Sequence, residues 1–181
     1  MSVIGFCETG RVIEVEYTLI VDVETSGMSA ARGGRVIEIG AVLLEDGRIV
    51  DEFTSLIDSG AAIHYGAYRV HGISAQMLAG QPIPHVIWPD FARFVGNAQL
   101  VAHNAPFDSS FIRHELALLG LQLANTWHCT VRLARLKLPQ LPNHKLETVY
   151  RHLFGELPMG VQRHRALDDA RMTARVWVAL T

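Results

Sequence analysis

YTLIVDVETSG, residues 17–27, contains the strand around which the rest of the chain must be arranged. Residues 17–23 form an apolar run rich in β-branched side chains, which is typical of a buried β-strand. Because side chains alternate between the two faces of a strand, Asp22 and Glu24 leave the same face. Residues 25–27, Thr-Ser-Gly, then end the strand. The segment predicts a buried strand with two carboxylates side by side at its end.

Two later apolar runs extend this strand into a sheet. Residues 35–44 and 49–57 both predict strands, and the turn between them contains Gly47, which supplies the positive φ that a hairpin needs. Residues 99–102 predict a fourth, short strand. Helices are predicted at 89–96, after the prolines at 82, 84 and 89, and then from Asn104 to Gly120, near 130–137, near 145–154 and from 166 to the end. This order indicates an α/β fold with a mixed central sheet flanked by helices.

The composition indicates a single globular domain. The chain has 181 residues, of which 49% are hydrophobic and 19% charged, and these proportions exclude a disordered protein. Cys7 and Cys129 are far apart and have no metal-type spacing, so we expect two inert thiols. No leader pattern and no membrane-spanning run is present, and we expect a cytoplasmic protein.

The net charge limits the way in which the chain could bind nucleic acid. At −2 it has the wrong sign for a module that neutralises phosphates with a basic face. An enzyme whose positive charge comes from bound cations is not excluded, because acidic metal ligands make the apoprotein more negative. Two neighbouring carboxylates on one strand face, such as those of Asp22 and Glu24, repel each other, and a divalent cation bound between them usually offsets this repulsion. Taken alone, the pair favours the simpler interpretation of solvated acids at the end of a strand.

Two further segments place acids at the starts of helices. Asp108 ends VAHNAPFD (101–108), where a lone acid could simply complement the helix dipole. HRALDDA (164–170) holds both Asp168 and Asp169. Asp169 shares a helix face with the apolar stripe that must point inward, whereas Asp168 shares one with Arg171 and Arg175. We therefore assign Asp169 to a site and Asp168 to surface ion pairs.

Five strings in order resemble the DEDDh 3′–5′ exonuclease superfamily, especially the epsilon-type proofreading exonucleases of bacterial DNA polymerase III and their stand-alone relatives. They are VDVETSG (21–27), VIEIGAV (36–42), HGIS (71–74), AHNAPFD (102–108) and HRALDDA (164–170). The resemblance implies a ribonuclease-H-like fold and one exonuclease domain over residues 17–181, preceded by an N-terminal extension over residues 1–16.

The resemblance also implies a site, residue by residue. The expected ligands of two divalent cations, Mg²⁺ or Mn²⁺, are Asp22, Glu24, Asp108 and Asp169, and His164 is the expected general base. Histidine suits that task because its ordinary pKa lies near 6.5. The expected substrate contacts are Glu24, Thr25, His71, His103, Asn104, Phe107 and His164. His71 could instead only cap a turn before Ser74.

The expected activity is release of nucleoside 5′-monophosphates from a free 3′ end, in proofreading, repair or end trimming. DNA is favoured over RNA because residues 27–40 and 143–149 look more like the epsilon-type group. Because the chain stops at Thr181, twelve residues after Asp169, we expect no C-terminal tether to a polymerase, although association with one stays open. An RNA-directed relative and a catalytically silent adaptor are alternatives. A zinc hydrolase is disfavoured, since His114-Glu115 begins HExxH but position 118 is Leu.

Overall fold

The computed structural model describes residues 4–6, 12–14, 17–162 and 164–181. Its main sheet has five strands in the order β5-β4-β3-β6-β7. The strands are β3 (Tyr17–Thr25), β4 (Val36–Glu45), β5 (Arg48–Leu56), β6 (Gln99–Ala102) and β7 (Trp127–Cys129). β3, β4 and β5 form an antiparallel meander, while β6 pairs parallel with both β3 and β7. The predicted mixed sheet is therefore confirmed.

The hairpin between β4 and β5 has the tight turn that the sequence predicts. Glu45 and Arg48 are partners at its end, and the two residues between them, Asp46 and Gly47, have φ values of 47° and 76°. Positive φ at both central positions matches the right-handed twist of the flanking strands, and glycine reaches that region without steric cost. The turn fixes the register of β5 against β4.

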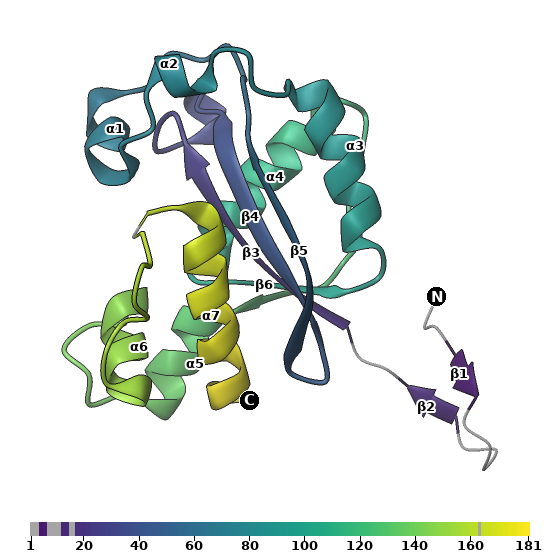
Figure 1. The fold of residues 1–181 in the computed structure, drawn as a ribbon, viewed down its shortest axis with the longest axis vertical. Helices are drawn as coiled ribbons and strands as arrows, with labels where there is room; N and C mark the ends of the chain where they lie inside the picture. The colour runs from purple at the N-terminus through teal and green to yellow at the C-terminus, as the bar shows by residue number, and fades with distance from the viewer. Residues whose placement is uncertain (1–3, 7–11, 15–16, 163) are drawn as a thin grey trace.

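Helices cover both faces of the sheet (Figure 1). One face packs against α3 (Pro84–Val95) and α4 (Ala105–Ala117) through a core that includes Val21, Phe91 and Phe111. The other packs against α7 (Ala166–Leu180) through residues such as Ile20 and Val42, and α5 (Thr130–Lys137) and α6 (Leu146–Phe154) pack against α7 in turn. Odd positions of β3 enter the first core and even positions face α7, so Asp22 and Glu24 point towards α7.

Several helix boundaries differ from the predictions. α3 begins at Pro84 rather than near residue 89, because a proline in the first turn lacks only an N–H that has no helical partner, and Pro89 inside the helix removes a single bond. Asn104 precedes α4 but makes no side-chain cap; it adopts φ 72°, ψ 47° instead. α1 (Tyr65–His71), α2 (Ala75–Leu78), the short 3-10 helix η1 (Ala30–Arg32) and β7 were not individually predicted.

The N-terminal extension contains one short antiparallel pair, β1 (Ile4–Phe6) with β2 (Val12–Glu14). The expectation for Cys7 lies outside the described residues, whereas Cys129 is a free, half-buried thiol. No helix among the described residues has the length and apolar content that a membrane crossing requires.

Candidate active site at the end of β3

The first two acids lie at the end of β3 on the face that α7 covers. In the pairing with β4, Asp22 is opposite Gly40 and Glu24 is opposite Glu38. Asp22 is half-buried and Glu24 is buried. Cross-strand partners share a face of the sheet, so three carboxylates and one residue without a side chain lie together here.

Asp108 reaches the same strand from the first turn of α4. β6 pairs with β3 only as far as Ile20, which leaves the rest of that edge of β3 without a strand neighbour. The backbone N–H of Val23, beyond that point, donates to Asp108 Oδ1 at 3.2 Å, and the Asp108 side chain is buried. The carboxylate thus replaces a missing strand contact between Asp22 and Glu24, and this hydrogen bond fixes where it lies.

His164 and Asp169 come from the start of α7 and the residues just before it. His164 is exposed and has a left-handed backbone conformation with φ 58°, and its N–H donates to Asp169 Oδ2 at 3.2 Å. One ligand atom each from Glu24, His164 and Asp169 lie within 4.8 Å of one another. Side chains 140 residues apart in the sequence therefore form one cluster.

The acids resist ionisation in the absence of a cation. Burial, with added repulsion from Asp169, Glu38 and Asp108, raises the pKa of Glu24 to about 8. Burial likewise raises the pKa of Asp108 to about 8 and that of Asp169 to about 6. Asp22 has its pKa raised well above the ordinary range by burial and then by the charges of its acidic neighbours. Such a set is stable in its ionised form only beside positive charge.

The donor set fits divalent cations of the hard, oxygen-seeking kind. Carboxylate oxygens are the ligands that Mg²⁺ and Mn²⁺ prefer, and the clustered acids provide them from three different elements. Zinc sites normally use histidine or cysteine, and His164 is the one such residue in the described cluster. The chemistry of the ligands therefore agrees with the expected metal site.

The two other histidines expected in the site are already hydrogen-bonded to the protein through both ring nitrogens. His71 Nδ1 accepts from the N–H of Ile73 at 2.9 Å, and its Nε2 lies 3.3 Å from the carbonyl oxygen of Thr25. His103 Nε2 lies 2.9 Å from the carbonyl oxygen of His144, and its Nδ1 lies 2.8 Å from the Thr130 hydroxyl. Because a carbonyl only accepts, Nε2 carries the proton in both rings. Each ring thus joins two segments that border the site.

A cleft of about 840 Å³ opens beside the cluster. Its walls come from the β6–α4 junction, α5, the start of α6 and the start of α7, and they include His103, Asn104, Arg135, Lys145, Thr148, His164 and Asp169. Asn104 is exposed at its edge, while Phe107 is half-buried and packs on Phe111 with ring centroids 5.0 Å apart. The sequence prediction includes no residue of α5 or α6 in the site, although residues 143–149 resemble the epsilon-type group.

Glu38 was also missed, although the sequence carries a signal for it. An acid inside the apolar run VIEIGAV needs a partner, because an unpaired buried carboxylate is costly. The structure gives it Arg165 and the N–H of Ala166. Asp168, by contrast, pairs with Arg171 at 3.3 Å as expected.

The zinc-hydrolase alternative is not supported. Glu115 Oε1 and Oε2 accept from Arg35 Nε and Nη2 at 2.8 and 2.7 Å, and Oε1 also accepts from the N–H of Val36. The Glu115 side chain is fully buried in this arrangement and belongs to no described metal-type cluster. It fastens α4 to the start of β4, which is a structural role.

Comparison with known proteins identifies the family. The family model RNase_T, described as an exonuclease, matches residues 19–177. DNA polymerase III PolC-type of Clostridium perfringens is 42% identical over 158 residues, which are 87% of this chain but 11% of that protein. DNA polymerase III subunit epsilon of Rickettsia typhi is 37% identical over 170 residues, 90% of this chain and 73% of that protein. The chain thus spans a small part of the first relative and most of the second.

Solved structures agree with the sequence comparison. Exonuclease X, in complex with 5′ overhanging duplex DNA, superposes with a TM-score of 0.73 at 30% identity, covering 90% of both chains. The nuclease domain of 3′hExo, a DEDDh family member bound to rAMP, has a TM-score of 0.75 at 18% identity, over 92% of both chains, and shows the same fold. The predicted ribonuclease-H-like fold is confirmed. The chain belongs to the RNase_T exonuclease family and is a 3′–5′ exonuclease.

Proposed function

We propose that this chain removes nucleotides from the 3′ end of DNA by hydrolysis at the cluster around Glu24, His164 and Asp169. The observation that carries the proposal is the approach of these three side chains to within 4.8 Å of one another. In the reaction, a water oxygen bonds to phosphorus and the bond to the 3′ oxygen of the preceding nucleotide breaks. The products are a nucleoside 5′-monophosphate and a strand shortened by one residue.

We assign the cation ligands to the four acids: Asp22, Glu24, Asp108 and Asp169. Their raised pKa values are the expected consequence of packing acids together for a cation that offsets their charge. When bound, two Mg²⁺ or Mn²⁺ ions would activate water and neutralise charge on the phosphate and the departing oxygen. The hydrogen bond from Val23 to Asp108 and that from His164 to Asp169 orient two of the ligands in advance.

His164 is the proposed general base. Its imidazole is exposed, so it can receive the proton of the attacking water and return it to solvent. The left-handed backbone conformation at His164 departs from the geometry of the helix that follows and places the ring beside Glu24 and Asp169. Strain of this kind persists where surrounding contacts over-determine it, as they do at many active sites.

The substrate contacts are proposed to come from Asn104 in the cleft wall and from residues at the end of β3 and the start of α4. Glu24 and Thr25 would meet the terminal nucleotide, Asn104 would meet the backbone of the strand, and Phe107 would provide an aromatic surface. Aromatic stacking tolerates any base at roughly 1–3 kcal/mol per base, so little sequence preference is expected. His71 and His103 are proposed to shape this pocket by holding the adjoining backbone, since their ring nitrogens already have partners.

DNA is the proposed substrate class. The relatives at 42% and 37% identity are named as DNA polymerase III chains, and the exonuclease X structure at 30% identity holds duplex DNA. The RNA-related neighbours lie below 20% identity and share the fold alone. A DNA substrate fits proofreading beside a DNA polymerase. It also fits repair or end trimming by an enzyme that acts alone. The cytoplasmic placement stays a prediction.

One assay tests the proposal and its alternatives. Matched DNA and RNA oligonucleotides, single-stranded and with a 3′ recessed or overhanging end, are incubated with Mg²⁺, Mn²⁺ or EDTA. We expect the wild-type protein to release 5′-mononucleotides stepwise from DNA with either cation and to release none with EDTA. The variant Asp169→Asn should release none with either cation. Faster release from RNA would favour the exoribonuclease alternative. Tight binding without cleavage in Mn²⁺ would favour the silent adaptor and overturn the proposal.

A further inference from the structure

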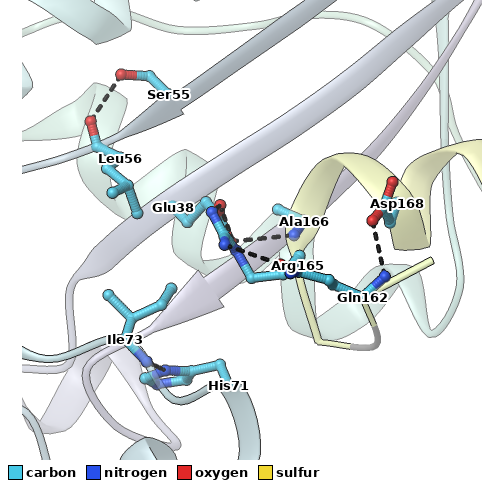
Figure 2. A network of polar contacts seen from close by, with 9 residues as sticks. All are labelled: Glu38, Ser55, Leu56, His71, Ile73, Gln162, Arg165, Ala166 and Asp168. Carbon is cyan, nitrogen blue, oxygen red and sulfur yellow. Dashed lines mark hydrogen bonds and ion pairs between the residues drawn. The ribbon is translucent and has the colours of Figure 1, made fainter. Parts of the chain in front are cut away.

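A partly buried ion pair joins Glu38, near the start of β4, to Arg165, the residue before α7 (Figure 2). Arg165 Nε and Nη2 donate to Glu38 Oε1 at 2.9 and 2.7 Å, and Glu38 Oε2 accepts from the backbone N–H of Ala166 at 3.1 Å. Glu38 is 3% exposed. Both carboxylate oxygens are therefore used to hold the first residues of one helix.

The same face of β4 lets the helix approach unusually closely. A Cβ atom at Gly40 would lie 2.1 Å from the backbone nitrogen of Leu167 and 2.3 Å from the carbonyl carbon of Ala166. Only glycine leaves room for the first turn of α7 to lie directly on the strand. Glu38 and Gly40, two residues apart, thus fix the start of α7 in two ways, by a charged contact and by close packing.

The contacts of Arg165 extend to the residues that carry the chemistry. His164 precedes it directly, and the N–H of Asp169 donates to the Arg165 carbonyl oxygen at 3.0 Å in the first helical turn. Its guanidinium also donates to Gln162 Oε1 at 3.3 Å. On the sheet, Glu38 is the cross-strand partner of Glu24. The ion pair therefore connects the strand that faces Glu24 to the segment that carries His164 and Asp169.

The remainder of α7 has independent attachments to the sheet. Its side chains enter the cores beside Ile20 and Val42, and Arg171 forms a second ion pair with Glu52 on β5 at 2.6 Å. The Arg165 side chain is 32% exposed, so removal of the Glu38 charge leaves a guanidinium that water can still reach rather than a fully buried, unpaired cation. Because the other attachments of α7 remain, the principal effect of removing the Glu38 carboxylate should be on the position of residues 164–169 rather than on the presence of the helix.

We propose that Glu38 and Arg165 are positioning residues, which hold His164 and Asp169 at the correct distance from Glu24 for hydrolysis. The inference rests on the proposed function, because it concerns the same site. It gives a role to the acid of VIEIGAV that the hydrolytic cluster itself does not use. Neither residue touches the substrate in this proposal; each acts through the start of α7.

The test compares Glu38→Gln with Glu52→Gln. Both remove the carboxylate of an ion pair between the sheet and α7, but Glu52 lies outside the site. We expect Glu38→Gln to lower kcat on a DNA oligonucleotide by about 10²-fold, the scale of a misplacement of about 1 Å, with KM within about twofold of wild type. Glu52→Gln should keep wild-type kcat. Amide hydrogen exchange of residues 164–169 should accelerate in Glu38→Gln and stay unchanged in Glu52→Gln.

A second variant separates positioning from folding. Arg165→Lys keeps the charge but loses the two-pronged geometry, so an intermediate loss of kcat with a native circular dichroism spectrum is expected. The double variant Glu38→Gln/Arg165→Lys should be no slower than Glu38→Gln alone, because the two residues act as a unit. Wild-type kcat in Glu38→Gln, or equal losses in Glu52→Gln, would overturn the inference. If wild type itself released no nucleotide, the proposed function would fail, and hydrogen exchange would still report whether the pair orders residues 164–169.

Discussion

Glu24 and Glu38 face each other across β3 and β4, and within the part of the chain that the structure describes only Glu38 forms an ion pair with a basic side chain. Arg165 binds Glu38 through two nitrogens, whereas Glu24 has Asp169 and His164 as its close neighbours. Two buried acids in equivalent strand positions are thus committed to different tasks. Glu38 holds the start of a helix in place, whereas burial and the neighbouring acids raise the pKa of Glu24 to about 8. This division explains how a site can be rigid before any cation binds.

The raised pKa values of the site acids should make the stability of the protein depend on pH. Glu24, Asp108 and Asp169 have pKa values raised from about 4 to about 8, 8 and 6. Groups with a raised pKa contribute stability that is present at low pH and lost as the pH rises through the folded value. In EDTA, the contribution of these acids should therefore fall between about pH 4 and 8. Thermal unfolding across this range, with and without Mn²⁺, should show a stabilisation by the cation that grows with pH.

A neutralised ligand provides the control for that measurement. Asp169→Asn should unfold in EDTA at pH 8 at a temperature equal to or above that of wild type, since one repelling charge is gone. It should also gain less from Mn²⁺. An equal response of both proteins to Mn²⁺ would show that the cation stabilises the chain somewhere else.

Removal of His164 should affect the rate more than binding. His164→Ala is expected to lower kcat by roughly 10²–10⁴-fold, the usual contribution of a general base. Binding of an oligonucleotide in Ca²⁺, measured by fluorescence anisotropy, should change little because the acids stay in place. Unchanged turnover would exclude His164 as the base, and a rate loss accompanied by an equal loss of affinity would assign it to substrate binding.

His103 should affect stability with the opposite pH dependence. Burial lowers its pKa to about 4, despite the hydrogen bond to the His144 carbonyl oxygen, which raises it. A histidine with a depressed pKa contributes stability above its unfolded value, near 6.5, and that contribution is lost as the pH falls towards 4. The difference in unfolding free energy between wild type and His103→Gln should shrink over this interval. A constant difference would mean that the pKa of the ring is the same in the folded and the unfolded protein.

Gly40→Ala should be harmful although it adds a single methyl group. The new Cβ would meet backbone atoms of Ala166 and Leu167, which cannot rotate away. We expect a loss of stability of at least about 1–3 kcal/mol, the usual cost of overpacking, and a loss of activity as the start of α7 moves. Urea unfolding measures the first and nucleotide release the second. Gly33→Ala is a useful comparison, because its added Cβ has no atom within 4 Å although φ 85° strains an alanine there; that variant should lose some stability but keep native activity.

Four of the five strands of the main sheet, and the two acids at the end of β3, follow from sequence patterns alone. Alternation along residues 17–23 placed Asp22 and Glu24 on one face, and Gly47 fixed the hairpin, because both features depend on backbone geometry that neighbouring residues set. The helical stripe likewise separated Asp169 from Asp168. Such local patterns have a fixed period, so they can be read without knowledge of distant contacts.

Which of these side chains already have partners within the protein depends on the tertiary structure. The ring nitrogens of His71 and His103 have backbone and hydroxyl partners up to 46 residues away, and the acid of VIEIGAV is paired with a residue 127 positions later. Cleft walls from α5 and α6 meet His164 only because both helices pack on α7. Hydrogen-bond partners and burial depend on how helices and strands pack against one another. The periodic pattern of residues within one helix or strand does not contain that information.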